Sequence, residues 1–292
     1  AELPTEKDAN TVSATTRRTM EVSRRRHIGH NRAMTADPIG SATAYVSEAE
    51  RIVVLTGAGI STDSGIPDFR GPNGVWTKDP KAEKASHIDH YLGDPEVRRA
   101  AWQSRLRAPV WSAQPNLGHR LLVDLERSGR MHALITQNID GLHQAAGSDP
   151  DRVIEVHGTV RYTRCWGCGD RRSMGEILDR VRSGEEDPAC EVCGGIVKSD
   201  TISFGQSLVP EVIDRAMRVS EECDLLLAVG STLSVYPVAN CVPIAKRSGA
   251  SVIIVNGQNT EMDRHADHVL IGQIADVLPS LIGNRPSGAA ES

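Results

Sequence analysis

The 292-residue sequence has few aromatic residues, few lysines and no long apolar run. Phe, Trp and Tyr together make up 3% of the chain, so aliphatic side chains must fill any core. No apolar stretch approaches the roughly 20 residues of a membrane-spanning helix, and the N-terminus lacks the apolar segment of a secretory signal. The formal net charge of −5 argues against general nucleic-acid binding. These absences predict a cytoplasmic protein with neither a membrane nor a direct nucleic-acid partner, and they leave its oligomeric state open.

Cysteine is scarce as well, but four of the six cysteines form two close pairs. The pairs are Cys165-x-x-Cys168 and Cys190-x-x-Cys193, with 21 residues between them. Four thiolates brought together by a chain reversal give the tetrahedral shell that a structural Zn²⁺ prefers, and no His, Asp or Glu at ligand spacing points to a catalytic metal. Disulfides are the alternative, but clustered thiols in a chain without other secretory features favour zinc. Cys223 and Cys241 lie in apolar segments and are predicted to be core thiols.

Short apolar runs alternate along the chain with segments of helical periodicity. The runs expected to be strands are 52–55, 132–135, 153–156, 225–229, 252–255 and 268–271. The expected helices are 42–47, 116–128, 209–220, 237–248 and 275–282. Continuous apolar strands are typical of a parallel sheet that is covered on both faces, and their alternation with helices predicts an α/β, doubly wound, Rossmann-like sheet.

Two segments interrupt this alternation and predict a smaller lobe inserted into the sheet domain. Residues 72–112 are interpreted as a helical insertion and residues 159–199 as the zinc-binding insertion. The Rossmann-like domain then consists of residues 41–71, 113–158 and 200–285. The polar, aperiodic ends, 1–40 and 286–292, are predicted to be tails, the first of them disordered. An organellar transit segment is the alternative for the first, which its acidic residues argue against.

The first predicted strand runs into a turn that contains Gly57 and Gly59 and ends at Ser61. Glycines at a strand-to-helix turn let a phosphate approach the backbone, and the helix that follows offers free N–H groups. Ser61 is suited either to cap that helix or to bind phosphate. Thr62 stands where the usual dinucleotide fingerprint has its third glycine. The turn therefore predicts a nucleotide site but not a routine dehydrogenase.

Polar residues follow other apolar runs and are expected to form one rim, because the carboxyl ends of parallel strands meet at the same edge of a sheet. They are Gln137, Asn138, Ile139 and Asp140 after the run 132–135, His157 after 153–156, Gly230, Ser231 and Thr232 after 225–229, and Asn256 after 252–255. His157 is a candidate general base because the imidazole pKa lies near neutrality, and a purely structural histidine is the alternative. The turn-rich stretch 64–71, which includes Phe69 and Arg70, predicts a functional lid.

These segments together resemble the sirtuin family of NAD-dependent protein lysine deacylases, of bacterial type. The resemblance is carried, in the family's order, by Gly57–Ser61, Gly65–Arg70, Thr136–Asp140, His157-Gly158, both cysteine pairs, Phe204-Gly205 and Gly230–Thr232. It spans about residues 42–282. The combination of motifs is far more specific than any one of them.

The resemblance implies NAD as the cosubstrate, one structural Zn²⁺, and acylated-lysine proteins or peptides as substrates. It implies catalytic roles for Asn138, Asp140 and His157, with His157 as the base. The acyl oxygen would attack the ribose carbon that carries nicotinamide, and the products would be free lysine, nicotinamide and O-acyl-ADP-ribose. The implied NAD contacts are Gly57, Ala58, Gly59, Ser61, Asp68, Phe69, Arg70, Gln137, Asn138, Ile139, Asp140, Gly230, Ser231, Thr232 and Asn256.

The resemblance also implies where the substrate lies. Ile202, Phe204 and Gly205 would contact a peptide that adds as a strand, and Trp102 and Arg105 would contact the acyl group. Ser199, Ser203 and Gln206 depart from the family's usual pattern, which leaves the peptide preference open. Arg105 keeps the charge that binds an acidic acyl group, whereas Trp102 replaces the usual Tyr. The alternative is that Trp102 is a core residue and Arg105 is solvated.

Two other functions stay open at this point. The same cleavage of NAD could serve mono-ADP-ribosyl transfer to a protein side chain. A non-catalytic NAD-sensing or zinc-dependent interaction module could share the fold, but the presence of Asn138, Asp140 and His157 argues against it.

Overall fold

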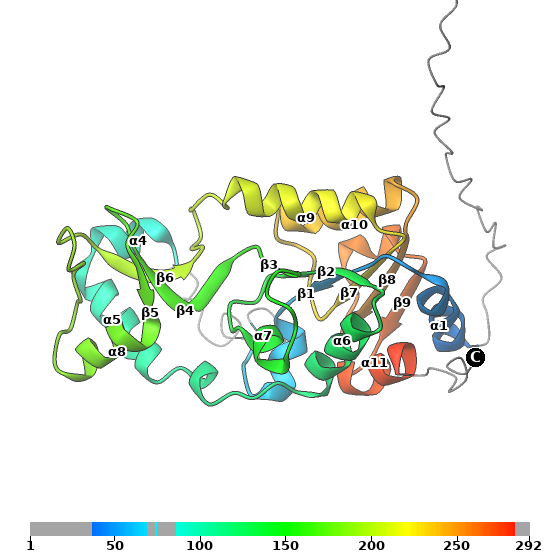
Figure 1. Ribbon diagram of the computed structural model, residues 1–292, viewed down its shortest axis with the longest axis horizontal. Helices are drawn as coiled ribbons and strands as arrows, with labels where there is room; N and C mark the ends of the chain where they lie inside the picture. The colour runs from blue at the N-terminus through cyan, green and yellow to red at the C-terminus, as the bar shows by residue number, and fades with distance from the viewer. Residues whose placement is uncertain (1–36, 69–73, 75–85, 284–292) are drawn as a thin grey trace, which may run out of the picture. The chain divides into compact units, whose positions relative to one another are not determined.

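The computed structural model describes residues 37–68, 74 and 86–283, and these belong to one compact unit (Figure 1). Residues 1–36 of the first expected tail, the second tail, and the candidate NAD contacts Phe69 and Arg70 lie outside the described residues. The expected boundary of the first tail at residue 40 is wrong, because the first helix already begins at Pro38, after the Asp37 N-cap.

A six-stranded, fully parallel sheet forms the larger part of this unit (Figure 1). The strands are β1 (Ile52–Thr56), β2 (Met131–Thr136), β3 (Val153–Glu155), β7 (Leu225–Val229), β8 (Ser251–Asn256) and β9 (His268–Ile271). Their order is β3-β2-β1-β7-β8-β9, so the chain builds outward from β1 in one direction and then from β7 in the other. The predicted doubly wound sheet is confirmed, and it has a topological switch point between β1 and β7.

Both faces of the sheet are covered by helices, which explains why its strands are apolar throughout. Val53 and Leu55 pack into a core with α9 (Pro210–Glu222) and α10 (Cys241–Arg247). Ile52 and Val54 point to the opposite face. That face is covered by α1 (Pro38–Glu48), α6 (Leu117–Arg127) and α11 (Ile274–Ile282), as Figure 1 shows.

Cys223 and Cys241 are core thiols, as predicted, and the expected helix 237–248 is present with a different first turn. Cys223 and Cys241 are fully buried in the core on the α9–α10 side. The expected helix 237–248 begins as a 3₁₀ turn, Val238–Asn240, before α10. A second 3₁₀ turn, Glu261–His265, precedes β9.

A second, three-stranded antiparallel sheet belongs to a smaller lobe. Its strands are β4 (Gly158–Cys165), β5 (Arg171–Ser173) and β6 (Val197–Thr201), in the order β5-β4-β6. It packs with α8 (Met174–Arg182) and α5 (Pro95–Leu106), and α4 (Ile88–Gly93) precedes α5. Trp102 from α5 shares one core with Met174 and Ile177 from α8. The two segments that interrupt the strand–helix alternation therefore fold against each other.

The first turn of the sheet differs from the expected α-helix. Residues Ala58–Ser64 form a 3₁₀ helix, which ends at Gly65 with φ +82°. Short polar side chains account for this, because Thr62 Oγ1 donates back to the Gly59 carbonyl and Asn116 donates to the Ile60 carbonyl. Within the described part of the chain, no helix is long and apolar enough to cross a membrane.

Candidate active site

The strand ends of the large sheet line up at one edge. Thr56 on β1 pairs in register with Thr136 on β2 and with Val229 on β7, and Val229 pairs with Val255 on β8. The polar residues that end these strands or follow them therefore stand side by side at the switch point. Open α/β sheets bind their ligands in this position.

Glycine is required at the turn after β1 because the backbone that follows β7 lies very close to this turn. The Gly59 N–H donates to the Gly230 carbonyl over 2.8 Å. A Cβ on Gly57 would lie 2.7 Å from Ser231 Cβ, and one on Gly59 would lie 2.8 Å from Gly230 Cα. The sequence predicts these glycines to be needed for the approach of a phosphate. The structure shows that the close contact between the segments after β1 and β7 is by itself a sufficient reason for glycine.

The candidate NAD residues form one connected rim. Gln137 Nε2 donates to Ser231 Oγ over 2.7 Å, and Asn256 Nδ2 donates to the Ser231 carbonyl over 2.8 Å. Ser231 Oγ also accepts the Leu233 N–H. The predicted rim residues after β2, β7 and β8 are thus brought together, and Thr232 beside them is half-buried. Asp68, the last described residue before the gap, is half-buried as well.

Asp140, Asn138 and Ser61 are buried and bonded to one another. Ser61 Oγ donates to Asp140 Oδ2 over 2.8 Å, and Asn138 Nδ2 donates to Ser61 Oγ over 3.1 Å. The Leu142 N–H fixes the second carboxylate oxygen, Oδ1, at 2.8 Å. A carboxylate with both oxygens bonded in a buried place has a fixed direction. Protein groups alone therefore fix the orientation of these side chains.

Two buried histidines behind this network were not singled out from the sequence. His119 Nδ1 accepts the Asn116 N–H, which puts the proton on Nε2, 3.5 Å from Ser61 Oγ. His143 Nε2 lies 3.0 Å from Thr56 Oγ1, and the two rings are 4.9 Å apart. Burial lowers the pKa of His119 to about 4 and that of His143 to about 3. Both rings are therefore neutral near pH 7. The spacing Asn116-x-x-His119, which forms a capping box at the start of α6, is the signal in the sequence that could have identified His119 as a structural residue.

His157 lies at the junction between the two sheets. Its Nδ1 donates to the Gln137 carbonyl over 3.0 Å, which leaves Nε2 as the basic nitrogen. Burial lowers the pKa of His157, and the hydrogen bond to the Gln137 carbonyl works in the opposite direction. The His157 carbonyl accepts the N–H of Ile202, so the histidine is also tied to the predicted peptide segment.

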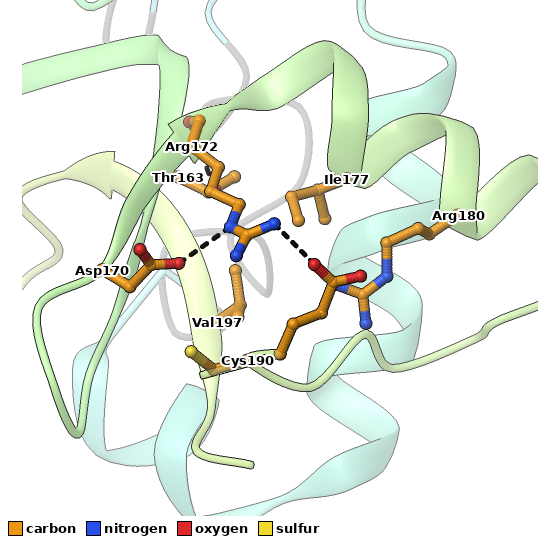
Figure 2. Close-up of a pocket in the computed structure, with 8 residues that line it drawn as sticks. Thr163, Asp170, Arg172, Ile177, Arg180, Cys190 and Val197 are labelled. Carbon is orange, nitrogen blue, oxygen red and sulfur yellow. Dashed lines mark hydrogen bonds and ion pairs between the residues drawn. The ribbon is translucent and has the colours of Figure 1, made fainter. Parts of the chain in front are cut away.

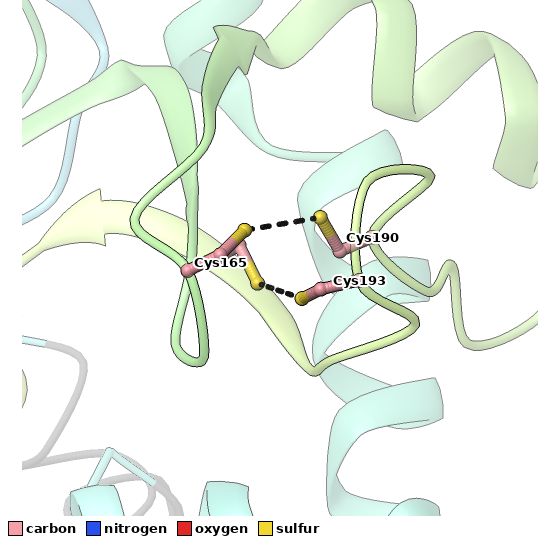
Figure 3. Close-up of side chains that lie close together, drawn as sticks. Cys165, Cys190 and Cys193 are labelled. Carbon is pink, nitrogen blue, oxygen red and sulfur yellow. Dashed lines mark hydrogen bonds between the residues drawn. The ribbon is translucent and has the colours of Figure 1, made fainter.

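The four paired cysteines form one cluster. Cys165, Cys168, Cys190 and Cys193 place their sulfur atoms within 4.8 Å of one another (Figure 3). The Sγ–Sγ distance is 3.5 Å for Cys165 and Cys193, and 3.7 Å for Cys168 and Cys190. Zn–S bonds of about 2.3 Å in a tetrahedron require sulfur separations of about 3.8 Å, so the cluster fits a structural zinc ion.

Arg172 joins the two turns that carry these cysteines. Its guanidinium bonds Asp170 beside the first pair over 2.9 Å and Glu191 inside the second pair over 2.5 Å (Figure 2). A pocket lined by Arg172, Glu191 and Cys190 lies at this junction. The ion pairs account for its polar lining, so the pocket belongs to the support of the metal cluster.

Comparison with known proteins decides the family. The model of the Sir2 family matches residues 57–237, which include the switch-point residues up to Thr232 and all four clustered cysteines. The chain belongs to the Sir2 family. The resemblance to the sirtuins that the motifs predicted is thereby confirmed.

Individual sirtuins match over most of this chain. The NAD-dependent protein deacetylase 2 of Streptomyces coelicolor is 46% identical over 231 residues, which cover 79% of this chain and 96% of the relative. The NAD-dependent protein deacetylase 1 of Bradyrhizobium diazoefficiens is 42% identical, over 82% of this chain and 93% of the relative. A solved Sir2 complex with a deacetylated p53 peptide and 3′-O-acetyl ADP-ribose has a TM-score of 0.77 and 34% identity, and the match covers 84% of this chain and 97% of that one.

The predicted peptide segment of this sirtuin is held by the small lobe. Phe204 forms a parallel β-bridge to His87. The Ile88 N–H donates to the Phe204 carbonyl, and the Phe204 N–H donates to the Ser86 carbonyl. Gly205 has φ +79°, and a Cβ there would lie 2.4 Å from the His87 ring. Phe204 nevertheless keeps 38% of its surface exposed. The segment is thus fixed on one side and presents an aromatic side chain to solvent.

The two predicted acyl-selecting residues of this sirtuin lie within the small lobe. Trp102 is fully buried, and the Arg105 guanidinium stacks 4.9 Å from its ring and 5.5 Å from that of Tyr91. Arg105 Nη2 donates to Ser199 Oγ over 3.2 Å, while its Nη1 is buried with no hydrogen-bond partner among the described residues. Burial lowers the pKa of Arg105 and lowers that of the neighbouring Lys198 to about 8. Lys198 is a second buried cation that sequence reasoning missed.

Proposed function

We propose that this sirtuin is an NAD-dependent protein lysine deacylase that releases nicotinamide and O-acyl-ADP-ribose. The observation that carries the proposal is the meeting of Asn138, Asp140 and His157 at the carboxyl edge of the large sheet, on loops that are hydrogen-bonded to each other. Ser61, His119 and Asp140 lie together here, but Ser61 Oγ donates to Asp140 and His119 presents its protonated Nε2, so no histidine base among the described residues faces the Ser61 hydroxyl. This suits a reaction that depends on the NAD glycosidic bond for its driving force. NAD, when bound, supplies an activated ribose carbon with a cationic leaving group.

His157 acts as the base in this proposal. Its Nδ1–H is held by the Gln137 carbonyl, so Nε2 faces away from that bond with a free lone pair. A pKa below the ordinary histidine value keeps Nε2 unprotonated at neutral pH. Nε2 is therefore ready to accept a proton from a ribose hydroxyl.

Asn138 and Asp140 bind the nicotinamide side and its ribose. Their side chains are fixed by Ser61 and by the Leu142 N–H, so little ordering is needed when NAD arrives. The rim formed by Gln137, Ser231 and Asn256 holds the remainder of NAD. We assign these contacts to the domain made of residues 41–71, 113–158 and 200–285, and the structural zinc ion to the inserted lobe. The full set of proposed NAD contacts stays the one that the family resemblance implies.

The acylated lysine enters between Ile202–Gly205 and the rim, in a peptide that binds mainly through its backbone. Arg105 is the proposed contact for an acidic acyl group, because its Nη1 is buried without a protein acceptor. Trp102 shapes that side from the small-lobe core. We assign the protein to the cytoplasm, where reducing conditions keep the four cysteines available as zinc ligands.

One assay tests the activity directly. Purified protein is incubated with NAD and one peptide that carries acetyl, succinyl or a long acyl group, and the products are identified by mass spectrometry. O-acyl-ADP-ribose together with free lysine is the expected result. Consumption of NAD with ADP-ribose retained on protein, and no deacylated peptide, would replace the proposal by mono-ADP-ribosyl transfer.

The same assay with Arg105→Met examines the acyl group. We expect a selective loss of turnover on the succinyl peptide, because the variant removes the cation and keeps an unbranched, largely aliphatic stem. An equal loss on the acetyl peptide would assign Arg105 to the small-lobe core instead.

A further inference from the structure

The loop 137–141, which carries Asn138 and Asp140, is bonded by three donor groups to residues 157–161, that is, to His157 and the first part of β4. His157 Nδ1 donates to the Gln137 carbonyl, and the Val160 N–H donates to the Ile139 carbonyl over 2.9 Å. The third donor is the guanidinium of Arg161. The Val160 donor is a backbone N–H, and His157 is the proposed base. Arg161 is therefore the one donor of the three that a substitution can remove without changing the backbone or the base.

Arg161 grips the Asp140 carbonyl with two nitrogens. Its Nε donates over 3.0 Å and its Nη2 over 2.7 Å to the same oxygen. The side chain also packs on the next peptide unit, since a Cβ on Gly141 would lie 3.0 Å from Arg161 Nε and 3.3 Å from Cγ. Gly141 has φ +71°, so this turn depends on glycine for its conformation and for the room that Arg161 occupies. The other end of the same residue, the Asp140 carboxylate, is held by Ser61 and the Leu142 N–H.

Trp111 holds Arg161 from the opposite side. The Arg161 guanidinium carbon lies 5.8 Å from the centre of the Trp111 ring, within the range of a cation–π contact. The Trp111 indole N–H donates to the carbonyl of Arg105, in the last turn of α5. A continuous set of contacts therefore leads from α5, through Trp111 and Arg161, to the Asp140 peptide unit.

We propose that Arg161 and Trp111 form a positioning clamp that sets the loop 137–141 for the nicotinamide side of NAD. Neither residue is placed on substrate, and both act through Asp140, so the inference rests on the NAD-binding role of this loop in the proposed function. The clamp ties that loop to the helix that carries Trp102 and Arg105. Loosening it affects the use of NAD more than the use of peptide.

Steady-state kinetics of Arg161→Met tests the clamp. The variant keeps an unbranched, largely aliphatic stem and removes every donor. We expect the KM for NAD to rise about five- to twentyfold, as the loss of a charged hydrogen-bond donor implies, while the KM for the acyl peptide changes less than twofold. Arg161→Lys keeps a donor and the charge, and it should restore part of the NAD affinity. A merely structural residue would lower the amount of active protein and leave both KM values as they are.

A double-mutant cycle adds Trp111. If the two side chains act as one device, Trp111→Leu raises the KM for NAD as well, and the double variant Trp111→Leu/Arg161→Met is no worse than Arg161→Met alone. Arg182→Met is the matched control, because Arg182 is an exposed small-lobe arginine paired only to Asp179 among the described residues, and it should leave both KM values unchanged. An unchanged KM for NAD in Arg161→Met, or fully additive effects in the cycle, would overturn the clamp. Failure of the proposed function would show differently, as no NAD cleavage by the wild-type chain, and calorimetric NAD affinities of the same variants would then decide the inference.

Discussion

The direction of one proton determines what His157 can do. Because Nδ1–H is committed to the Gln137 carbonyl, the ring presents a lone pair at Nε2 and cannot easily turn over. Burial disfavours the charged ring and keeps that lone pair available near pH 7. The same logic, a side chain fixed by a bond on its far side, applies to the Asp140 carboxylate and to Asn138.

Replacing His157 by alanine should reduce deacylation at least about 100-fold, the usual contribution of a general base. The fold should persist, because among the described residues the ring makes a single side-chain hydrogen bond, to the Gln137 carbonyl. Turnover by mass spectrometry and thermal unfolding measured on the same preparation check both parts. His90→Ala, at an exposed position in the small lobe, is the control and should behave as wild type. Wild-type turnover in His157→Ala would remove this histidine from the chemistry.

At the scale of elements, the four-cysteine cluster adds to a small apolar core in the small lobe. Its three strands are short, and its apolar cluster includes Cys165 and Cys190 themselves. Arg172 adds ion pairs across the two cysteine turns, but exposed pairs of this kind contribute little by themselves. A zinc ion bound by the four cysteines would therefore contribute strongly to the stability of this lobe.

Cys165→Ser should release the zinc ion and unfold the small lobe, since three thiolates and a hydroxyl bind zinc far more weakly than four thiolates. Metal content by atomic absorption and the loss of β-structure by circular dichroism measure the result. Cys241→Ala is the control, because Cys241 is buried in the large-sheet core and away from the cluster. A full equivalent of zinc in Cys165→Ser would refute the four-cysteine site.

At the scale of the whole molecule, two buried neutral histidines make the folded state less stable at acid pH. His119 and His143 have folded-state pKa values of about 4 and about 3, below the ordinary value of 6.5. The unfolded chain therefore binds more protons than the folded chain at pH values below about 6.5. Stability is fully present above that pH and is lost as the pH falls toward the folded-state values.

The free energy of unfolding should fall on the order of 4 kcal/mol between pH 7.5 and pH 5, about 2 kcal/mol for each histidine, as the linkage relation gives for depressed histidine pKa values. Urea denaturation at the two pH values measures this change. His143→Gln keeps an N–H donor for Thr56 and does not titrate, so it should show a smaller fall while the metal cluster stays the same in both proteins. An equal fall in wild type and His143→Gln would mean that other groups govern the acid sensitivity.

The sequence by itself determined the architecture of the sheet and the presence of a metal cluster. Six apolar runs of strand length that alternate with helices leave few arrangements other than a doubly wound sheet, and two cysteine pairs at this spacing leave few uses other than zinc. It also indicated which strand ends carry the polar residues, because the carboxyl edge of a parallel sheet follows from the direction of the chain.

Only the tertiary structure decided how these residues are held. Glycine is needed at positions 57 and 59 because Gly230 and Ser231, more than 170 residues later in the sequence, lie in close contact with them. The pairing of Arg161 with the Asp140 carbonyl and Trp111, and the burial of His119 against His143, depend on contacts between separate elements. Such contacts leave no local periodicity or motif in the chain. They follow from packing in three dimensions, which sets burial, proton position and direction for side chains whose identity the sequence already contains.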